Sequence, residues 1–189
     1  MRSSAASDVY KRQQGQVRSE QMITISLCMI VKNEEKVLAR CLDSIADLMD
    51  EIIIVDTGSS DNTKEIAKKY TDKIYDFAWI DDFSAARNYS FSKATKEYIY
   101  VADADEVIDA DNHRKLAELK EVLIPEIEIV QMRYCNQLTN GTAYNFDEEY
   151  RPKLYKRQRE FTWIEPVHEM VRLDPVVYDS EIDILHMPE

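Results

Sequence analysis

Three acidic side chains follow an apolar run near the middle of the chain. Asp103, Asp105 and Glu106 come directly after the run Tyr98–Ala102. In an extended segment residues i and i+2 point the same way, so Asp103 and Asp105 are expected to converge. Two carboxylates this close repel each other unless a cation or proton relieves them, and Mg²⁺ or Mn²⁺ suits such oxygen ligands. The spacing favours a divalent-cation site, and a solvated acidic turn is the alternative.

Polar residues also follow two earlier apolar runs. Asn33 and Glu34 come just after the run that ends at Val31, and Asp56 ends the next run. Such residues can line a ligand crevice or cap the following helix, and the strand-end position of Asp56 favours ligand binding. Arg87, farther along, could hold diphosphate oxygens or pair with a surface acid.

A third group of candidates lies late in the chain. Glu165, His168 and Glu169 cluster in the segment WIEPVHEMV, and His186 lies near the end. A histidine can complete a metal shell, although a single one is commonly a hydrogen-bonded structural residue. His168 and His186 are therefore candidate metal ligands beside Asp103 and Asp105.

The elements that must position these residues alternate between strands and helices. Apolar runs predict buried strands at 24–31, 51–56 and 97–102, and a short third strand is expected at 73–77. Helical spacing of apolar residues and capping residues predict helices at 35–48, 63–70 and 83–94. This alternation implies βαβ units and a parallel sheet, which binds ligands at the carboxyl ends of its strands.

After residue 109 the pattern becomes mixed. It predicts a helix at 113–123 and a hairpin of 128–138 with 143–146 around a turn at 139–142. Short strands are expected at 153–157, 161–164, 167–171 and 176–186. The fold class is therefore α/β, with a mainly parallel central sheet and a mixed C-terminal half.

Composition narrows the possible functions. The 189 residues suit one domain, and 24 Lys and Arg against 36 Asp and Glu give a net charge of −12. This balance argues against a general nucleic-acid binder. The chain has only three glycines, which excludes a Walker A loop and a GxGxxG fingerprint. Its three cysteines form no CxxC pair, and no signal peptide or membrane-spanning run is visible, so we expect a cytoplasmic protein.

The two ends of the chain carry expectations of their own. Residues 1–21 are polar and without period, so we expect them to be disordered and outside the fold. They also resemble translated sequencing-adapter sequence, which would make them an artefact. We expect one domain over residues 22–189, cut short at its C-terminus.

Five motifs in order resemble glycosyltransferase family 2 with the GT-A fold, a Rossmann-like fold of nucleotide-diphospho-sugar transferases. They are SLCMIVKNEE, EIIIVDTGSSDNT, DFSAARN, YIYVADADE and PVHE, and the resemblance covers Thr24 to Glu169. It is closest to a bacterial branch in which a helical-repeat region can follow the catalytic domain. The resemblance implies inverting transfer from a nucleotide-diphosphate sugar with Mg²⁺ or Mn²⁺. UDP is favoured as the nucleotide on family frequency.

The resemblance also implies roles for individual residues. Asp56 would contact the nucleotide base, Arg87 the nucleotide or diphosphate, and Asp103 the ribose or the metal, while Asp105 would ligate the metal. The full nucleotide-sugar set is Val31, Asn33, Glu34, Asp56, Arg87, Asp103 and Ala104. One departure is Thr57, which stands where many relatives carry a second acid. Another is the end of the chain, where the branch often has an HYGY-like segment.

An inverting transferase also needs a carboxylate to receive the acceptor proton. It must come from the mixed half, across the crevice from Asp105. Glu169 is preferred because PVHE resembles the late motif of the family, and Glu165 and Asp147 are alternatives. The acceptor, which could be a glycan, a lipid-linked sugar, a peptide or a protein, stays open, as does the oligomeric state.

Two other functions stay open at this point. One is a catalytically silent domain that binds nucleotide sugars or acts as a scaffold. The other is a haloacid dehalogenase-type phosphohydrolase, in which Asp103 would be the nucleophile and Asp105 the acid or base. Against the second, its DxD motif normally follows the first strand of the core, whereas this one follows the fourth.

Overall fold

The computed structural model describes residues 22–137, 143–144, 149–157, 163–164, 170–171 and 175–188. The expectations for residues 1–21 and for the turn at 139–142 therefore lie outside the described residues. The first half contains four parallel strands: β1 (Ile25–Val31), β2 (Glu51–Asp56), β3 (Ile74–Asp76) and β4 (Tyr98–Val101). Between them lie α2 (Leu38–Ile45), the 3₁₀ helix η1 (Ala46–Leu48), α3 (Thr63–Ala67) and α4 (Phe83–Lys93). The predicted βαβ order of this half is confirmed.

The second half is mixed, as predicted. It contains α5 (Ala110–Val122) and the strands β5 (Glu106–Val107), β6 (Ile129–Gln137), β7 (Ala143–Tyr144), β8 (Tyr150–Lys156), β9 (Trp163–Ile164), β10 (Met170–Val171) and β11 (Val177–His186). β8 is antiparallel to both β4 and β6, and β11 runs parallel to β6. The two-residue strand β5, which pairs with β11, was not expected from the sequence.

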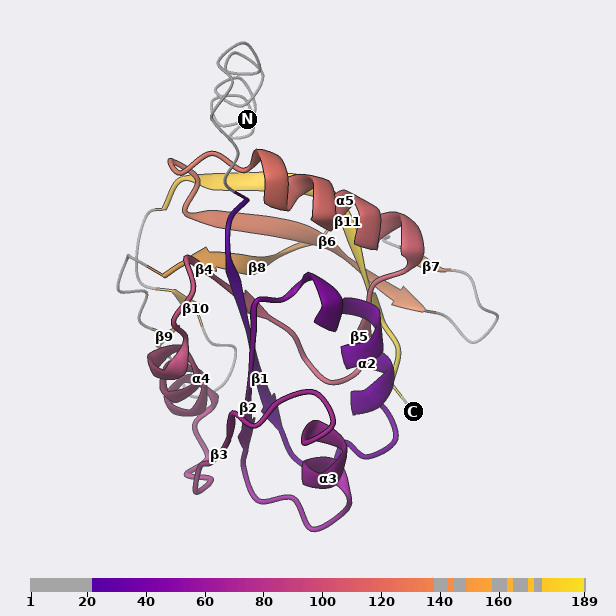
Figure 1. Ribbon diagram of the computed structural model, residues 1–189, viewed down its shortest axis with the longest axis vertical. Helices are drawn as coiled ribbons and strands as arrows, with labels where there is room; N and C mark the ends of the chain where they lie inside the picture. The colour runs from indigo at the N-terminus through magenta and orange to yellow at the C-terminus, as the bar shows by residue number, and fades with distance from the viewer. Residues whose placement is uncertain are drawn as a thin grey trace.

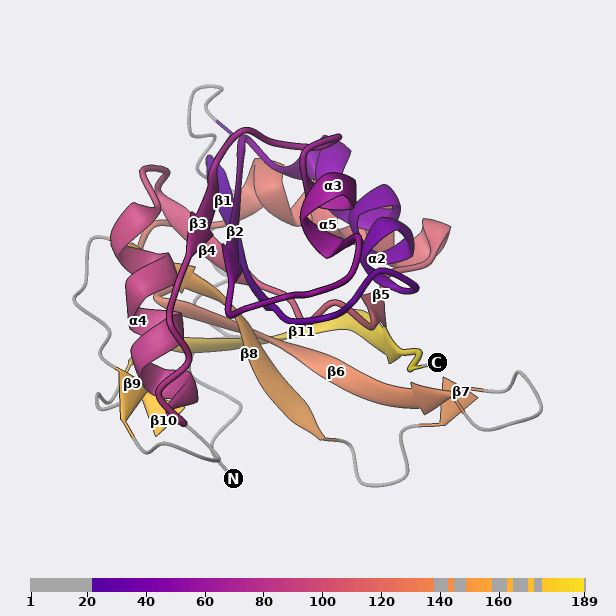
Figure 2. The same ribbon diagram turned by 90° about the horizontal axis from the view of Figure 1, so that it is seen from below.

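One large sheet joins the two halves. Its strands follow the order β3-β2-β1-β4-β8-β6-β11-β5, with β7 beside β6, while β9 and β10 form a separate small sheet. The helices α2, α3 and α5 lie on one face of the large sheet and α4 lies on the other (Figure 1 and Figure 2). Because β1, β2 and β4 are parallel neighbours, their carboxyl ends lie together at one edge of the sheet.

Three helices differ from the sequence expectation, and one of them, α5, begins at Ala110 rather than at residue 113, because the Asp109 side chain caps it by accepting the Asn112 N–H. α2 begins at Leu38 rather than at residue 35, because the Glu34 carbonyl accepts the N–H groups of both Val37 and Leu38 in a preceding turn. α3 ends at Ala67, since the N–H groups of Lys69 and Tyr70 bond three residues back and close a turn. The ends of helices depend on such local bonds, which periodicity does not reveal.

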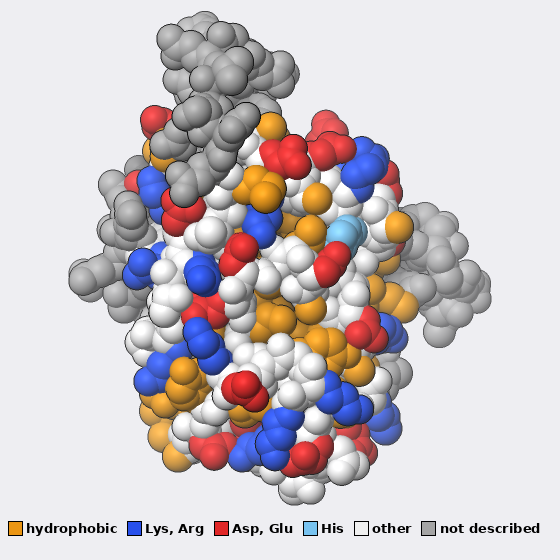
Figure 3. Space-filling view, viewed as in Figure 1, with side chains coloured by type: hydrophobic (Ala, Val, Ile, Leu, Met, Phe, Trp, Pro, Cys, Tyr) orange, Lys and Arg blue, Asp and Glu red, His pale blue; other side chains and the backbone are white. Residues whose placement is uncertain are grey.

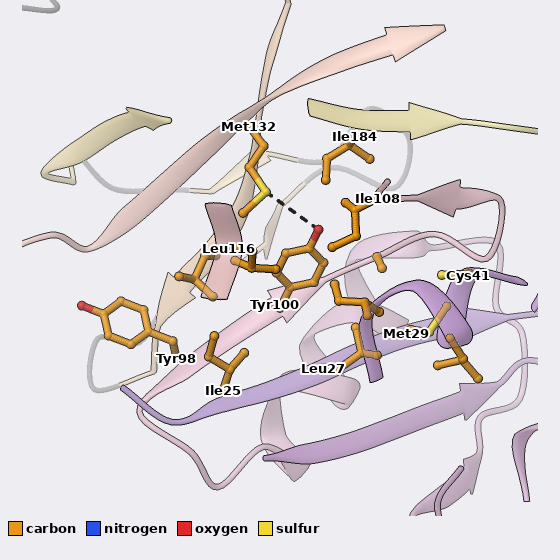
Figure 4. Close-up of a cluster of buried hydrophobic side chains, with 14 of the residues drawn as sticks. Ile25, Leu27, Met29, Cys41, Tyr98, Tyr100, Ile108, Leu116, Met132 and Ile184 are labelled. Atoms are coloured by element: carbon orange, nitrogen blue, oxygen red, sulfur yellow. Dashed lines mark hydrogen bonds between the residues drawn. The ribbon is translucent and has the colours of Figure 1, made fainter. Parts of the chain in front are cut away.

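The apolar core lies on both faces of the sheet. Ile25, Leu27 and Met29 of β1 pack beneath α2 and α5, and Cys28 packs on the opposite face. Figure 4 shows the larger cluster, in which the Tyr100 hydroxyl donates to the Met132 sulfur at 3.8 Å. Residues of both halves share this cluster, so the sheet is one packed unit.

The charged side chains are interspersed on the face that Figure 3 shows. Blue and red atoms alternate there, and neither sign forms a broad continuous field. In the described part of the chain, no helix has the length and apolar character needed to span a membrane.

Candidate functional site

The loops that follow β1 and β2 are bound to each other. Asn33 has a φ of 57°, a left-handed conformation that asparagine adopts more readily than most residues. Its N–H donates to Ser59 Oγ at 2.9 Å, and its Oδ1 accepts the Ser60 N–H at 2.8 Å. Asn33 therefore fixes the loops after β1 and β2 relative to each other.

A second set of bonds extends this connection. The Glu34 N–H donates to Thr63 Oγ1 at 2.7 Å. Glu35 Oε2 accepts from the Asn62 backbone N–H at 3.0 Å and from Asn62 Nδ2 at 2.8 Å. Asn62, the residue before α3, does not cap this helix with its own side chain. The polar cluster after β2 thus serves mainly to hold two loops together.

Asp56 lies at the end of β2 and is almost completely buried, with 1% of its surface exposed. Its Oδ1 accepts the N–H groups of Gly58 and Ser59, both at 2.9 Å, in a turn where Gly58 has a φ of 105°. Its Oδ2 is buried and has no hydrogen-bond partner among the described residues. A buried carboxylate oxygen without a donor is rare and calls for a ligand or water.

The Asp56 carboxyl is held in its charged form. Burial raises its pKa, but hydrogen bonds from Ser59 and Gly58 and the nearby charge of Lys64 outweigh burial, so the pKa lies below its usual value. Lys64 Nζ lies 3.7 Å from Asp56 Oδ1. Oδ2 is therefore a charged acceptor suited to an N–H donor of a ligand.

Val31 and Ala104, expected in the nucleotide-sugar set, are buried at 2% and 5% exposure. The Val31 carbonyl accepts the Thr57 N–H at 3.0 Å and the Thr57 hydroxyl at 3.2 Å. Their side chains belong to the core, which leaves the backbone as the only ligand contact these positions can offer.

Residues 103–106, which carry the acidic side chains Asp103, Asp105 and Glu106, form a turn after β4. The expected convergence of Asp103 and Asp105 assumed an extended segment at this place. The Glu106 N–H donates to the Asp103 carbonyl at 3.1 Å, and the Asp103 N–H donates to Glu106 Oε2 at 3.0 Å. These reciprocal bonds close the turn, so the argument from alternating side chains does not apply here.

The structure places two expected metal ligands in contact. His186 Nε2 lies 2.7 Å from Asp105 Oδ2, although 81 residues separate them in the chain. The Met187 N–H donates to the Asp105 carbonyl at 2.8 Å, and Arg40 of α2 donates to the Met187 carbonyl. The pairing of β5 with β11 brings these segments together, with His186 opposite Glu106.

Asp103 faces cationic side chains. Arg87 of α4 is buried, and its Nη2 lies 3.9 Å from Asp103 Oδ1. The surrounding protein raises the pKa of the Asp103 carboxyl, but the charges of Lys153, Arg87 and Arg151 outweigh this, so the pKa is lowered overall. The structure thus brings Arg87 close to the acidic turn.

Sequence reasoning missed two residues of β8 beside this turn. Lys153 and Glu106 form an ion pair with only 4% and 3% of their surfaces exposed. Arg151 stacks on the ring of Tyr134, with its Cζ 3.4 Å from the ring centre. The predicted strand at 153–157 already contained Lys153, and the period of two between Arg151 and Lys153 is the signal that could have extended that strand back to Arg151.

The described residues can supply only part of the ligand shell of a metal ion. Among them, no group of three or more His, Cys, Asp or Glu side chains is placed to hold a metal. Asp105 Oδ2 and His186 Nε2 are nevertheless about as far apart as neighbouring ligands on an octahedron with bonds of about 2.1 Å, roughly 3 Å. The pair could therefore hold an ion whose other ligands come from phosphate and water.

The remaining expected site residues lie outside the described residues. These are the candidate bases Glu169, Glu165 and Asp147 and the candidate ligand His168. Their roles stay predictions.

Known structures share this fold. Staphylococcus aureus TarS aligns with a TM-score of 0.62 at 15% identity, over 88% of this chain and 37% of that one. Glucosyl-3-phosphoglycerate synthase from Mycobacterium tuberculosis, in complex with Mg²⁺ and uridine-diphosphate, aligns with a TM-score of 0.62 at 15% identity, over 97% of this chain and 76% of that one. The fold is the α/β GT-A fold that the sequence predicted.

Sequence comparisons give the family. The profile of Glycosyl transferase family 2 matches residues 26–171. The SPbeta prophage-derived glycosyltransferase SunS of Bacillus subtilis is 41% identical over 125 residues, which are 65% of this chain and 29% of that protein. A TPR repeat-containing protein of Synechococcus elongatus is 36% identical over 150 residues, 79% of this chain and 36% of that protein. The chain belongs to glycosyltransferase family 2, and it spans about a third of the length of these two relatives.

Proposed function

We propose that this chain transfers a sugar from a uridine-diphosphate donor to an acceptor, with inversion at the anomeric carbon and with Mg²⁺ or Mn²⁺. The observation that carries the proposal is the placement of two acidic groups at one sheet edge. Asp56 ends β2, the Asp105–His186 pair follows β4, and only β1 lies between these strands. Two strand spacings correspond to about 10 Å. A nucleotide can extend over this distance from its base to its diphosphate.

The base would bind at Asp56. The buried, charged Oδ2 of Asp56 has no partner among the described residues and can accept the ring N–H of uracil. Two structural neighbours support the choice of nucleotide, since glucosyl-3-phosphoglycerate synthase and TarS are each known in complex with uridine diphosphate.

The diphosphate would lie at the turn after β4. Asp105 and His186 would hold the divalent ion, which supplies positive charge to the leaving diphosphate when it is bound. Arg87, buried beside Asp103, adds a fixed cation at the same place. A preorganised cation stabilises negative charge as it develops on the leaving group.

The acceptor proton would go to a carboxylate of the mixed half. Glu169 remains our choice, with Glu165 and Asp147 as alternatives, on the resemblance of the PVHE segment to the late motif of the family. The family assignment leaves the haloacid dehalogenase-type alternative without support.

The test is the dependence of nucleotide binding on Asp105. We expect calorimetric titration to show that the parent protein binds uridine diphosphate with Mn²⁺ much better than either alone, because carboxylate and phosphate share the ion. Asp105→Ala should weaken this joint binding by about 10-fold or more, the scale of a lost charged contact. Asp111→Ala, which removes an exposed acid from α5, is the matched control and should change nothing.

Equal binding by the parent and Asp105→Ala would refute the metal assignment. A parent protein that binds the donor but neither hydrolyses nor transfers its sugar would favour the silent binding domain.

A further inference from the structure

Arg151 lies near the carboxyl end of β4 because of the direction of β8. β8 is antiparallel to β4, with Tyr98 opposite Lys156 and Tyr100 opposite Leu154, so the start of β8 lies toward the carboxyl end of β4. Arg151 lies near this start, opposite Met132 of β6.

The Arg151 guanidinium is held in one orientation. It stacks on the buried ring of Tyr134, whose other neighbour is the ring of His186, 5.4 Å away between ring centres. Its Nε donates to Glu149 Oε1 at 2.8 Å. Arg151, Tyr134 and His186 therefore form a stack that leads from β8 to Asp105.

The two terminal nitrogens of Arg151 have no hydrogen-bond partner among the described residues. In the described part of the chain, Arg151 donates no hydrogen bond except the one from Nε. Its side chain is 41% exposed, so the terminal edge can be reached from solvent. An arginine fixed by stacking, with its two-nitrogen edge open, is preorganised to bind an oxyanion in a bidentate manner.

The neighbouring cations do not offer the same edge. Lys153 is buried against Glu106, and Arg87 is buried beside Asp103.

We propose that Arg151 binds a phosphate or carboxylate group of a reacting substrate at the carboxyl end of β4. This inference rests on the proposed function and names a further anion-binding residue for it. The anion belongs either to the diphosphate of the donor or to an acidic acceptor, and two titrations distinguish these sources.

The first titration adds uridine diphosphate with Mn²⁺ to the protein without an acceptor. The second adds inorganic phosphate to protein already saturated with uridine diphosphate and Mn²⁺. Arg151→Met should weaken one of the two by about 10-fold or more, the scale of a lost charge-assisted hydrogen bond. A loss in the first assigns the donor diphosphate, and a loss in the second alone assigns an acceptor anion.

Matched variants separate binding from a structural role. Arg151→Lys keeps the charge but not the planar fork, so an intermediate loss is expected, and it carries the test if Arg151→Met does not fold. Tyr134→Phe keeps the stacking ring and should bind like the parent, whereas Tyr134→Leu removes the ring and should bind more weakly. Arg114→Met removes an exposed arginine of α5 and should have no effect.

Unchanged binding in both titrations by a folded Arg151→Met protein would overturn the inference, as would an equal loss in Arg114→Met. Failure of the proposed function has a different signature. In that case the parent would not bind uridine diphosphate at all, and Arg151-dependent binding of pyrophosphate to the free protein would still test the anion site.

Discussion

Asp56 combines burial with an uncommitted oxygen. Its Oδ1 is occupied by two backbone N–H groups, and its Oδ2 is buried without a described partner. Desolvation of an unpaired polar atom is costly, so a fold retains one mainly where a ligand completes it. This makes Asp56 the residue whose substitution should change nucleotide preference and not only affinity.

Asp56→Asn should therefore weaken the preference of the protein for uracil over cytosine. The amide can keep an acceptor oxygen toward Gly58 and Ser59, which turns its NH₂ group toward the ligand. A donor there opposes the ring N–H of uracil but matches the unprotonated ring nitrogen of cytosine. We expect the affinity for uridine diphosphate relative to cytidine diphosphate to fall by about 10-fold or more, as measured by competitive titration.

Asp76→Asn is the control for this substitution. Asp76 occupies the position opposite Asp56 on β3 and also contacts Lys64, but its side chain is exposed. It should leave the ratio unchanged. A ratio in Asp56→Asn equal to that of the parent would remove Asp56 from the base site.

Strand β8 stabilises the acidic turn through a buried ion pair. Its Lys153 pairs with Glu106, and the same Glu106 carboxylate accepts the Asp103 N–H. Lys153→Met leaves a carboxylate buried without its cation, which typically costs about 3–5 kcal/mol. We expect chemical denaturation to show a loss of that size in the free energy of unfolding.

The double variant Lys153→Met/Glu106→Gln tests the cause. Because no buried charge remains in it, its loss should be clearly smaller than that of Lys153→Met. Lys68→Met, which breaks an exposed pair with Glu65, should cost no more than about 1 kcal/mol. A double variant less stable than Lys153→Met would mean that the pair does not act through charge.

Glu51, at the start of β2, makes the opposite end of the sheet sensitive to acid. Burial raises its pKa, but hydrogen bonds from Lys73, Ser26 and Thr95 outweigh this and lower the pKa from 4.5 to about 2. A carboxyl whose folded pKa is depressed stabilises the fold above its unfolded pKa and loses this contribution as pH falls toward its folded pKa. We expect stability to fall by on the order of 3 kcal/mol between about pH 5 and pH 2 on account of Glu51.

Glu51→Gln isolates that contribution. The variant cannot titrate at this position, so its denaturation midpoint should depend less on pH in the same window while remaining lower than that of the parent at pH 7. If the parent and the variant lose stability in parallel on acidification, Glu51 is not the group responsible.

The sequence predicted the elements that local pattern determines. Strands β1, β2 and β4 lie in largely apolar runs, and α4 and the mixed second half followed from spacing and turn residues. β5 was missed because it depends on pairing with β11, about 80 residues farther along. The turn at Asp103 was missed because bonds between Asp103 and Glu106 close it, which the pattern of side chains does not reveal. For the same reason Asp105 and His186 were separate candidates, and their contact became visible only with the strand pairing.

At the scale of the whole molecule, the two halves share one sheet. β8 lies between β4 and β6, so residues of the second half cover the edge of the parallel half. Leu154 and Met132 of the second half also lie in the same buried cluster as Leu27 and Tyr100. The first half therefore does not contain all the partners that its own core needs.

We expect residues 22–124 alone to lack a cooperative thermal transition that residues 22–189 show. The shorter chain would expose the edge of β4 and the apolar side chains that β8 and β6 cover. Circular dichroism during heating checks this. A sharp transition in the shorter chain would show that the parallel half folds independently.

The three cysteines of the chain are free and buried, on β1 (Cys28), α2 (Cys41) and β6 (Cys135). Burial raises the pKa of each thiol, so none of them is a reactive thiolate in the folded protein. Each can be alkylated only when its own part of the molecule opens. The rates at which a thiol reagent labels the three cysteines therefore measure how often each part of the sheet opens locally. No probe has to be introduced by mutation.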